Sequence, residues 1–135
     1  MEITRRTDYA IRMMLELARS GGAPVSVRTL AERQGVPYAF ARAVQRDLAA
    51  AGLVYTKRGA TGGVVLCCDP AEVTLLRIIE ATQGTPSVAV CANDASWCSR
   101  SGGCAVHQVW RGADEMLSRY LGSKTLEGLI SEEGR

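Results

Sequence analysis

The chain has 135 residues, of which 47% are apolar and only 5% aromatic, so it can form one compact domain with a largely aliphatic core. No segment is long and apolar enough to cross a membrane, and none resembles a signal peptide, so we expect a cytoplasmic protein without membrane contacts. The net charge of +2 is unevenly distributed: residues 1–68 carry ten Lys and Arg against five Asp and Glu, whereas residues 69–135 carry six against nine. A basic first half is typical of a module that faces nucleic acid, and the acidic second half indicates a different role.

Three helices are predicted in the first half of the chain. Apolar residues recur at helical spacing over residues 3–19. Ser26 is a good N-cap for a second helix over residues 27–34, which Gly35 ends. A third helix is expected over residues 37–51, because proline is favoured at the start of a helix. Two short helices joined by a tight turn form the helix-turn-helix pattern.

A β-hairpin is predicted directly after these helices. Two runs of β-type residues, 53–56 and 64–68, flank a turn that is rich in glycine and basic residues, Arg58-Gly59-Ala60-Thr61-Gly62-Gly63. A hairpin in this position is the wing of a winged helix.

The third helix has a face suited to contacts with bases. We expect Phe40, Val44 and Leu48 to pack into the core, which turns Arg42 and Gln45 outward. Arginine pairs with guanine and glutamine with adenine, and an arginine on the wing can contact the minor groove or phosphates. The alternative is a solvated basic helix on an ordinary domain, which the adjoining hairpin disfavours. The candidate DNA-binding residues are Arg28, Tyr38, Ala39, Arg42, Gln45, Arg46, Lys57, Arg58 and Gly59.

The second half contains one long loop and one long helix. A fourth helix is predicted to end near residue 82, and residues 84–103 then show little periodicity, which in a small domain usually marks a functional loop. Residues 104–121 carry an apolar stripe that predicts an amphipathic helix and a homodimer, and residues 125–130 form a last helical turn or two. The predicted fold is therefore mainly α with a small β-hairpin wing: a winged helix-turn-helix over residues 1–70, then a loop and a dimerisation helix over residues 71–135.

Three of the five cysteines lie in or beside this loop. Cys91, Cys98 and Cys104 occur in a chain with no sign of secretion, where a metal or redox role is favoured over disulfides. Structural zinc normally uses pairs of cysteines with two to four residues between them, and this triplet has no such pair. The wide spacing suits an iron–sulfur cluster, and three thiolates leave one position for a weaker ligand. Free or redox-active thiols and a zinc site are the alternatives.

The other two cysteines, Cys67 and Cys68, are expected to be structural. They end the second predicted strand, and adjacent residues of a strand point to opposite faces, so they cannot easily bind one ion together.

Several motifs together resemble the IscR, NsrR and RirA family of bacterial winged-helix iron–sulfur transcription regulators. They are residues 1–10 (Met-Glu-Ile-Thr-Arg-Arg-Thr-Asp-Tyr-Ala), Gln34-Gly35-Val36-Pro37, Gly52-Leu53-Val54, Arg58-Gly59-x-x-Gly62-Gly63, the cysteine triplet with Cys104-Ala105-Val106-His107-x-x-Trp110, and Thr125-Leu126-x-x-Leu129. The resemblance covers nearly the whole chain. It implies a homodimer that binds a duplex DNA operator as a repressor, and a [2Fe-2S] or [4Fe-4S] cluster near the dimer-forming helix. It also implies a response to iron or cluster status, nitric oxide or redox stress.

Two residues are candidates for the fourth ligand. His107 lies three residues after Cys104, so both side chains could face one side of the helix, although an ordinary helix residue is the alternative. Asp8 matches the carboxylate position of the NsrR-like relatives, where it would come from the other subunit. Its alternative role is an ion pair with Arg12, four residues further along the first helix.

Two other classes of protein are less compatible with the sequence. No plausible catalytic constellation is present, so we do not expect an enzyme. An electron-transfer or cluster-delivery protein would need neither a wing nor the uneven distribution of charge.

Overall fold

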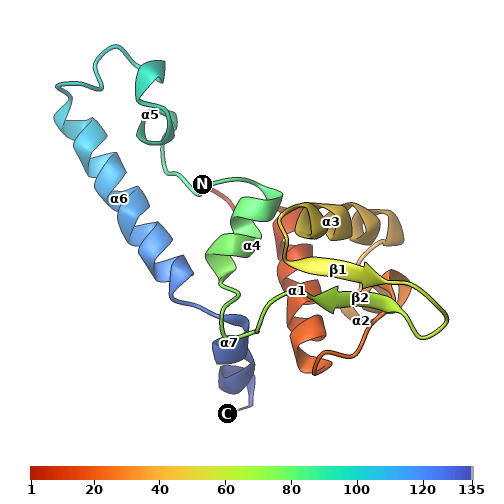
Figure 1. Cartoon of the computed structure of the whole chain (residues 1–135). Coiled ribbons are helices and arrows are strands. Elements are labelled where there is room, and N and C mark those ends of the chain that lie inside the picture. The colour runs from red at the N-terminus through yellow and green to blue at the C-terminus, as the bar shows by residue number, and fades with distance from the viewer. Residues whose placement is uncertain (135) are drawn as a thin grey trace.

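The computed structural model describes residues 1–134 and consists mainly of helices with one hairpin (Figure 1). In chain order the elements are α1 (Arg5–Arg19), α2 (Val27–Gln34), α3 (Tyr38–Ala50), β1 (Val54–Lys57), β2 (Gly63–Leu66), α4 (Leu75–Thr82), α5 (Val90–Asn93), the 3-10 helix η1 (Ala95–Trp97), α6 (Ala105–Gly122) and α7 (Leu126–Glu133). The predicted order of a helix-turn-helix followed by a wing is confirmed.

The helix-turn-helix is built by local signals at its ends. Ser26 caps α2, since its hydroxyl accepts a hydrogen bond from the backbone N–H of Thr29 at 3.0 Å. Gly35 ends α2 in the left-handed conformation, with φ of 63°, and the N–H of Val36 donates to the carbonyl of Ala31 at 2.8 Å. This glycine turn sets the direction of α3, which begins directly after Pro37.

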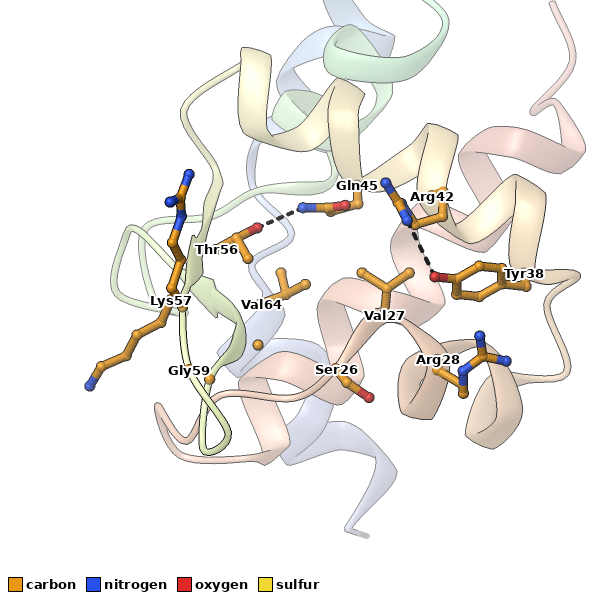
Figure 2. Close-up of a pocket in the computed structure, with 13 residues that line it drawn as sticks. Ser26, Val27, Arg28, Tyr38, Arg42, Gln45, Thr56, Lys57, Gly59 and Val64 are labelled. Atoms are coloured by element: carbon orange, nitrogen blue, oxygen red, sulfur yellow. Dashed lines mark hydrogen bonds between the residues drawn. The ribbon is translucent and has the colours of Figure 1, made fainter.

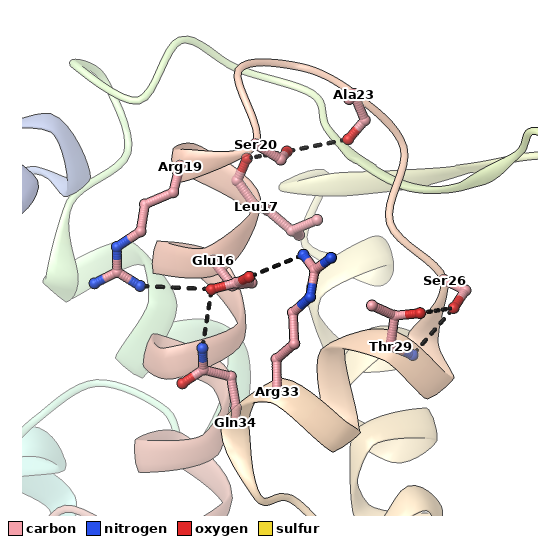
Figure 3. Close-up of polar contacts among 9 residues, drawn as sticks. All are labelled: Glu16, Leu17, Arg19, Ser20, Ala23, Ser26, Thr29, Arg33 and Gln34. Carbon is pink, nitrogen blue, oxygen red and sulfur yellow. Dashed lines mark hydrogen bonds and ion pairs between the residues drawn. The ribbon is translucent and has the colours of Figure 1, made fainter.

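Polar contacts fix α2 against α1 (Figure 3). Glu16 of α1 accepts hydrogen bonds from Arg33 at 3.1 Å and from Gln34 at 3.0 Å. Arg19 lies 3.7 Å from the same carboxylate. Glu16 therefore pairs with one cation of α2 and one of α1, and holds the helix-turn-helix to the first helix.

The strands of the hairpin pair antiparallel, from Val54 opposite Leu66 to Lys57 opposite Gly63. The second strand begins one residue earlier than predicted and ends at Leu66, although the N–H of Cys67 still donates to the carbonyl of Leu53, the next pair in the same register. An isolated bridge between Val25 and Val64 attaches the hairpin to the segment before α2.

The hydrophobic core extends beyond residue 70. It joins residues of α1, α2, α3 and the hairpin with Val73, Ile78 of α4 and Leu126 of α7. The return of α7 is fixed by a bridge between Thr74 and Thr125, where the N–H of Leu126 donates to the carbonyl of Val73 at 3.0 Å. We call this part of the molecule, α1 to α4 with the hairpin and α7, the body.

The expectation that Phe40 packs into the core is wrong. Its side chain is 47% exposed, and its ring meets the ring of Tyr9 edge-on with centroids 5.8 Å apart. The face of α3 that packs against the body is formed by Ala41, Val44 and Leu48. Val44 and Leu48 are buried as predicted, but Ala41 takes the buried position that was predicted for Phe40. The small side chain of Ala41 permits close packing of the helix.

Residues 84–123 form an arm that extends away from the body (Figure 1). The segment predicted as an irregular loop contains α5 and η1, and Asp94 caps η1 by accepting from the N–H of Ser96 at 3.0 Å. Helix α6, which the structure describes in full, buries only His107. Its apolar side chains are exposed at heptad positions: Val106 by 53%, Val109 by 62%, Met116 by 70% and Tyr120 by 62%.

Candidate DNA-binding surface and cysteine segment

The predicted DNA-binding residues gather around one open groove between the starts of α2 and α3 and the hairpin (Figure 2). The groove has a volume of about 620 Å³. Of the predicted residues, those that line it are Arg28, Tyr38, Arg42, Gln45, Lys57, Arg58 and Gly59. Its lining contains four cations and, among the residues that the structure describes, no carboxylate. Such a surface suits a polyanion, with α3 able to enter a groove of duplex DNA.

Ala39 and Arg46, the other two predicted residues, lie outside the groove lining. Both are exposed on α3, and Arg46 lies one helical turn beyond Arg42. The DNA contacts of all nine predicted residues stay predictions.

Gln45 connects α3 to the wing. Its amide nitrogen donates to the hydroxyl of Thr56 on β1 at 2.7 Å, as Figure 2 shows. The amide oxygen stays available as an acceptor, and the hydrogen bond holds the hairpin at a set position relative to α3. Sequence reasoning missed Thr56, because the cross-element partner of a surface threonine has no local sequence signal.

Tyr38 lies between two arginines at the start of α3. The guanidinium carbon of Arg28 is 4.5 Å from the centre of the tyrosine ring. Arg42 donates to the tyrosine hydroxyl at 3.3 Å, and this hydrogen bond lowers the pKa of Tyr38. The three side chains therefore form one group within the groove.

Two glycines allow the wing to fold close to other backbone. A Cβ added to Gly62 would lie 2.0 Å from the carbonyl oxygen of Lys57. A Cβ added to Gly63, whose φ is 152°, would lie 2.6 Å from the carbonyl carbon of Val25. The fold of the wing therefore requires glycine at both positions, and this fold places Lys57 and Arg58 at the edge of the groove.

A set of polar contacts links the start of the arm to α3. Gln83, the residue after α4, accepts from the N–H of Thr4 at 3.0 Å and donates to the carbonyl of Glu2 at 2.8 Å. Two residues after Thr4, Arg6 donates to Asp47 of α3 at 2.6 Å, a hydrogen bond that raises the pKa of Arg6. The first residues of the chain therefore contact Gln83, directly before the arm, and the start of α1 contacts α3.

The cysteine triplet lies in the arm. Cys91 is in α5, Cys98 follows η1 and Cys104 caps α6; all three are half-buried free thiols. No three His, Cys, Asp or Glu side chains within residues 1–134 lie close enough together to hold one metal ion. The three thiols thus lie in one segment of the chain, but they are not arranged around a common metal-binding position.

His107 differs from an ordinary surface residue of a helix. It is 4% exposed, and its Nδ1 has no hydrogen-bond partner among the described residues. Ser101, in the same segment, is also buried with an unpartnered hydroxyl. A buried polar atom without a partner is costly, so it indicates a missing interaction. Three thiols and such an imidazole fit an iron–sulfur cluster in their donor chemistry.

Asp8, the other candidate ligand, lies on α1 and forms an ion pair with Arg12 at 2.9 Å. Its side chain is 47% exposed. In the described chain it therefore has the partner that the alternative role predicts, and ligation would require a second subunit.

Cys67 and Cys68 lie in the body, outside the arm. Cys67 is exposed, and desolvation by nearby protein atoms together with the neighbouring Cys68 raises its pKa, which disfavours the reactive thiolate. Arg77 lies 3.9 Å from the sulfur of Cys68, which packs against the core. The packing of Cys68 is compatible with a structural role, and the structural role of Cys67 stays a prediction.

Asp114 of α6 is a residue that sequence reasoning missed. Its carboxylate accepts from the hydroxyl of Ser87 at 2.6 Å and from the N–H of Val88 at 2.8 Å. It thereby attaches the chain that leads to Cys91 to the side of α6. Nothing in the sequence around Asp114 distinguishes it from a solvated acidic residue of a helix.

Among the described helices, none is both long enough and apolar enough to cross a bilayer.

Comparisons with known proteins agree with this arrangement. The family model described as Rrf2, iron-dependent transcriptional regulator, matches residues 3–132. The chain is 30% identical over 135 residues to a protein of Neisseria meningitidis serogroup A named as an HTH-type transcriptional regulator, covering 98% of this chain and 90% of that protein. It is 29% identical over 134 residues to the regulator IscR of Xenorhabdus nematophila, covering 98% and 81%.

Two solved structures share the fold. IscR of T. potens superposes with a TM-score of 0.78 at 25% identity, over 98% of this chain and 88% of that one. CymR, named the global cysteine regulator of B. subtilis, superposes with a TM-score of 0.79 at 28% identity, over 98% of both chains. The winged-helix fold and the resemblance inferred from the motifs are confirmed, and the family comprises regulators rather than enzymes. The chain belongs to the Rrf2 family of helix-turn-helix transcriptional regulators.

Proposed function

We propose that this regulator binds a duplex DNA operator as a homodimeric repressor, and that an iron–sulfur cluster on its arm controls the binding. The observation that supports the cluster most directly is the buried, unpartnered Nδ1 of His107 in the same segment of chain as three free thiols. Relatives named IscR and a family described as iron-dependent agree with it. The signal would be iron or cluster status, nitric oxide or redox stress.

Cys91, Cys98 and Cys104 would supply three thiolates, and His107 would supply the fourth donor. A cluster with one non-cysteine ligand supplies a site that is more open to nitric oxide and oxygen than one with four thiolates. The chain's own contribution is to hold Cys104 and His107 on the first turn of α6 and to attach the approach to Cys91 through Asp114. A [2Fe-2S] and a [4Fe-4S] cluster are both compatible with this donor set.

The homodimer would form through the exposed apolar stripe of α6. Side chains at heptad spacing that cover nothing in their own chain are typical of a helix that packs against a second copy. A two-fold dimer would present two copies of α3 to a palindromic operator.

The hydrogen bonds of Gln83 would connect a change in the arm with the helices that face the operator. Gln83, the residue directly before the arm, is hydrogen-bonded to the segment before α1, and Arg6 at the start of α1 is hydrogen-bonded to Asp47 of α3. Ordering of the arm on cluster binding would act on both the N-terminal segment and the dimer helix.

The experiment that tests the proposed function is anaerobic purification followed by an absorption spectrum, iron and sulfide analysis, and operator titration of the holo and apo proteins. We expect brown protein with iron and sulfide in similar amounts. We expect operator affinities that differ by about 5- to 150-fold, the usual range of allosteric coupling. Equal affinities for the two forms would contradict control by the cluster, and colourless protein without iron would contradict the cluster itself.

A separate prediction concerns the fourth ligand. Replacing His107 with alanine should abolish or shift the cluster absorption and reduction potential and change sensitivity to nitric oxide. Asp8→Ala should leave them unchanged, because Asp8 is paired with Arg12. Cys67→Ser is the matched thiol control. If Asp8→Ala instead loses the spectrum, the ligand is the partner subunit's carboxylate. If both variants keep it while Cys67→Ser or Cys68→Ser loses it, mixed ligation is wrong.

A cluster-free regulator that uses a thiol switch or zinc is the second candidate. Two observations favour it: the three thiols are not gathered around one point, and the neighbour CymR is named a cysteine regulator. It predicts colourless protein in which oxidation, or zinc, changes operator affinity. Cys98→Ser would remove that response.

A further inference from the structure

Tyr38 occupies an unusual position for an aromatic side chain. It is 40% exposed at the start of α3, so burial in the core does not explain it. Its ring faces Arg28, the second residue of α2, and its hydroxyl faces Arg42, one turn further along α3. One side chain therefore contacts cations from both helices of the helix-turn-helix.

Neither arginine has an acidic partner within residues 1–134. The ion pairs of the body use Arg6, Arg12, Arg19 and Arg33, whereas Arg28 and Arg42 form none. Two long cationic side chains that share a groove repel each other and are free to rotate. An aromatic face attracts a guanidinium, and a phenolic oxygen accepts a hydrogen bond from one, so Tyr38 restrains both.

The two contacts leave different parts of each guanidinium free. Arg42 uses Nη1 for the tyrosine hydroxyl at 3.3 Å, so its other N–H groups can still reach the edge of a guanine. Arg28 stacks on the ring with its guanidinium carbon 4.5 Å from the centre, against 6.0 Å for Arg42, so the ring restrains Arg28 more closely. Stacking uses the face of the guanidinium and leaves N–H groups at its edge available. It also lies in the first turn of α2, where backbone N–H groups favour a phosphate.

We propose that Tyr38 is a positioning residue for DNA recognition: its hydroxyl orients Arg42 toward a base edge, and its ring orients Arg28 toward a phosphate. The inference rests on the proposed operator binding and adds that the ring and the hydroxyl of Tyr38 orient different arginines. The lowered pKa of Tyr38, caused chiefly by the hydrogen bond from Arg42, agrees with the hydroxyl acting as an acceptor there.

The test separates the two halves of the side chain. Tyr38→Phe removes the hydroxyl and keeps the ring, whereas Tyr38→Leu removes both. The probe is a duplex that the wild-type protein selects from a random-sequence pool, titrated at several salt concentrations and against single base-pair changes. Tyr55→Phe is the matched control, because Tyr55 is an exposed tyrosine on β1 that does not line the groove.

Tyr38→Phe should lower the preference for the selected duplex by about five- to tenfold, at the base pair that Arg42→Ala also affects, with the salt dependence unchanged. In the double variant Arg42→Ala with Tyr38→Phe, the second change should add no further loss. Tyr38→Leu should in addition flatten the salt dependence by about one ion, as Arg28→Ala does. Tyr55→Phe should change neither property.

Two results would overturn the inference: Tyr38→Phe behaving like Tyr55→Phe, or additive losses in the double variant. Both require a wild-type protein that selects a duplex. A wild-type protein with no sequence preference would instead contradict the proposed operator binding, so the two failures are distinguishable. Thermal stability should be the same in all variants, since these side chains are exposed.

Discussion

Replacing Ala113 with aspartate should convert the proposed homodimer into monomers and weaken operator binding by about 10²- to 10⁴-fold. Ala113 lies in the middle of the α6 stripe, between Val109 and Met116, which are 62% and 70% exposed in the single chain. A carboxylate buried without a partner in a helix–helix contact is strongly unfavourable. Losing the dimer removes the second binding event on one operator, which accounts for the size of the effect.

The measurement is molecular mass in solution, together with operator titration. Gln108→Asp is the control, because it adds the same charge to an exposed position that lies about 140° around the helix axis from Ala113. We expect this variant to stay dimeric and to bind the operator as the wild-type protein does. A dimeric Ala113→Asp protein would show that the subunits associate through another surface.

Replacing Gly63 with alanine should destabilise the body by about 2–4 kcal/mol and impair the wing. The added Cβ would meet the carbonyl carbon and oxygen of Val25 and the nitrogen of Ser26, all between 2.6 and 2.9 Å away. These are backbone atoms and cannot rotate aside. Relief of the clash requires breaking the bridge between Val25 and Val64, which attaches the hairpin to the segment that caps α2.

Denaturant unfolding monitors this change, with Gly102→Ala as the matched control. Gly102 has open space where its Cβ would lie, so the same substitution there should leave the free energy of unfolding nearly unchanged. Operator affinity of Gly63→Ala should also fall, because Lys57 and Arg58 depend on the hairpin's position. Equal stability of the two variants would mean that the wing is not held by its contact with Val25.

Local signals predicted the helix-turn-helix and the wing with good accuracy. The capping hydroxyl of Ser26, the left-handed Gly35 and the proline before α3 act within a few residues, so their effects are visible in the sequence. The glycines of the wing were also recognised in the sequence as turn residues. Their close approach to the backbone of Lys57 and Val25 depends on the tertiary fold and has no local signal.

Long-range packing determined three features that could not be predicted from the sequence: the orientation of α3, the position of α7 and the burial of His107. The orientation of α3 depends on which side chain fits against α1, and the small Ala41 fills that position in place of Phe40. The return of α7 to the core depends on a bridge between two threonines, each of which also caps its own helix. The burial of His107 depends on how the residues before α6 fold against its first turn, which helical spacing alone does not reveal.

The bridge between Thr74 and Thr125 has a consequence for how the molecule unfolds. The chain is attached to the body on both sides of the arm, before it by the hydrogen bonds of Gln83 to the first residues of the chain and after it by the bridge at Thr125. The arm contributes little to the core, so it can open as a local unit while the body stays folded. Amide hydrogens of α5 should therefore exchange with solvent far faster than those of Ile78 and Leu126. Under the proposed function, a chain that has lost its cluster keeps a folded body and can be reloaded, instead of exposing a core that proteases would recognise.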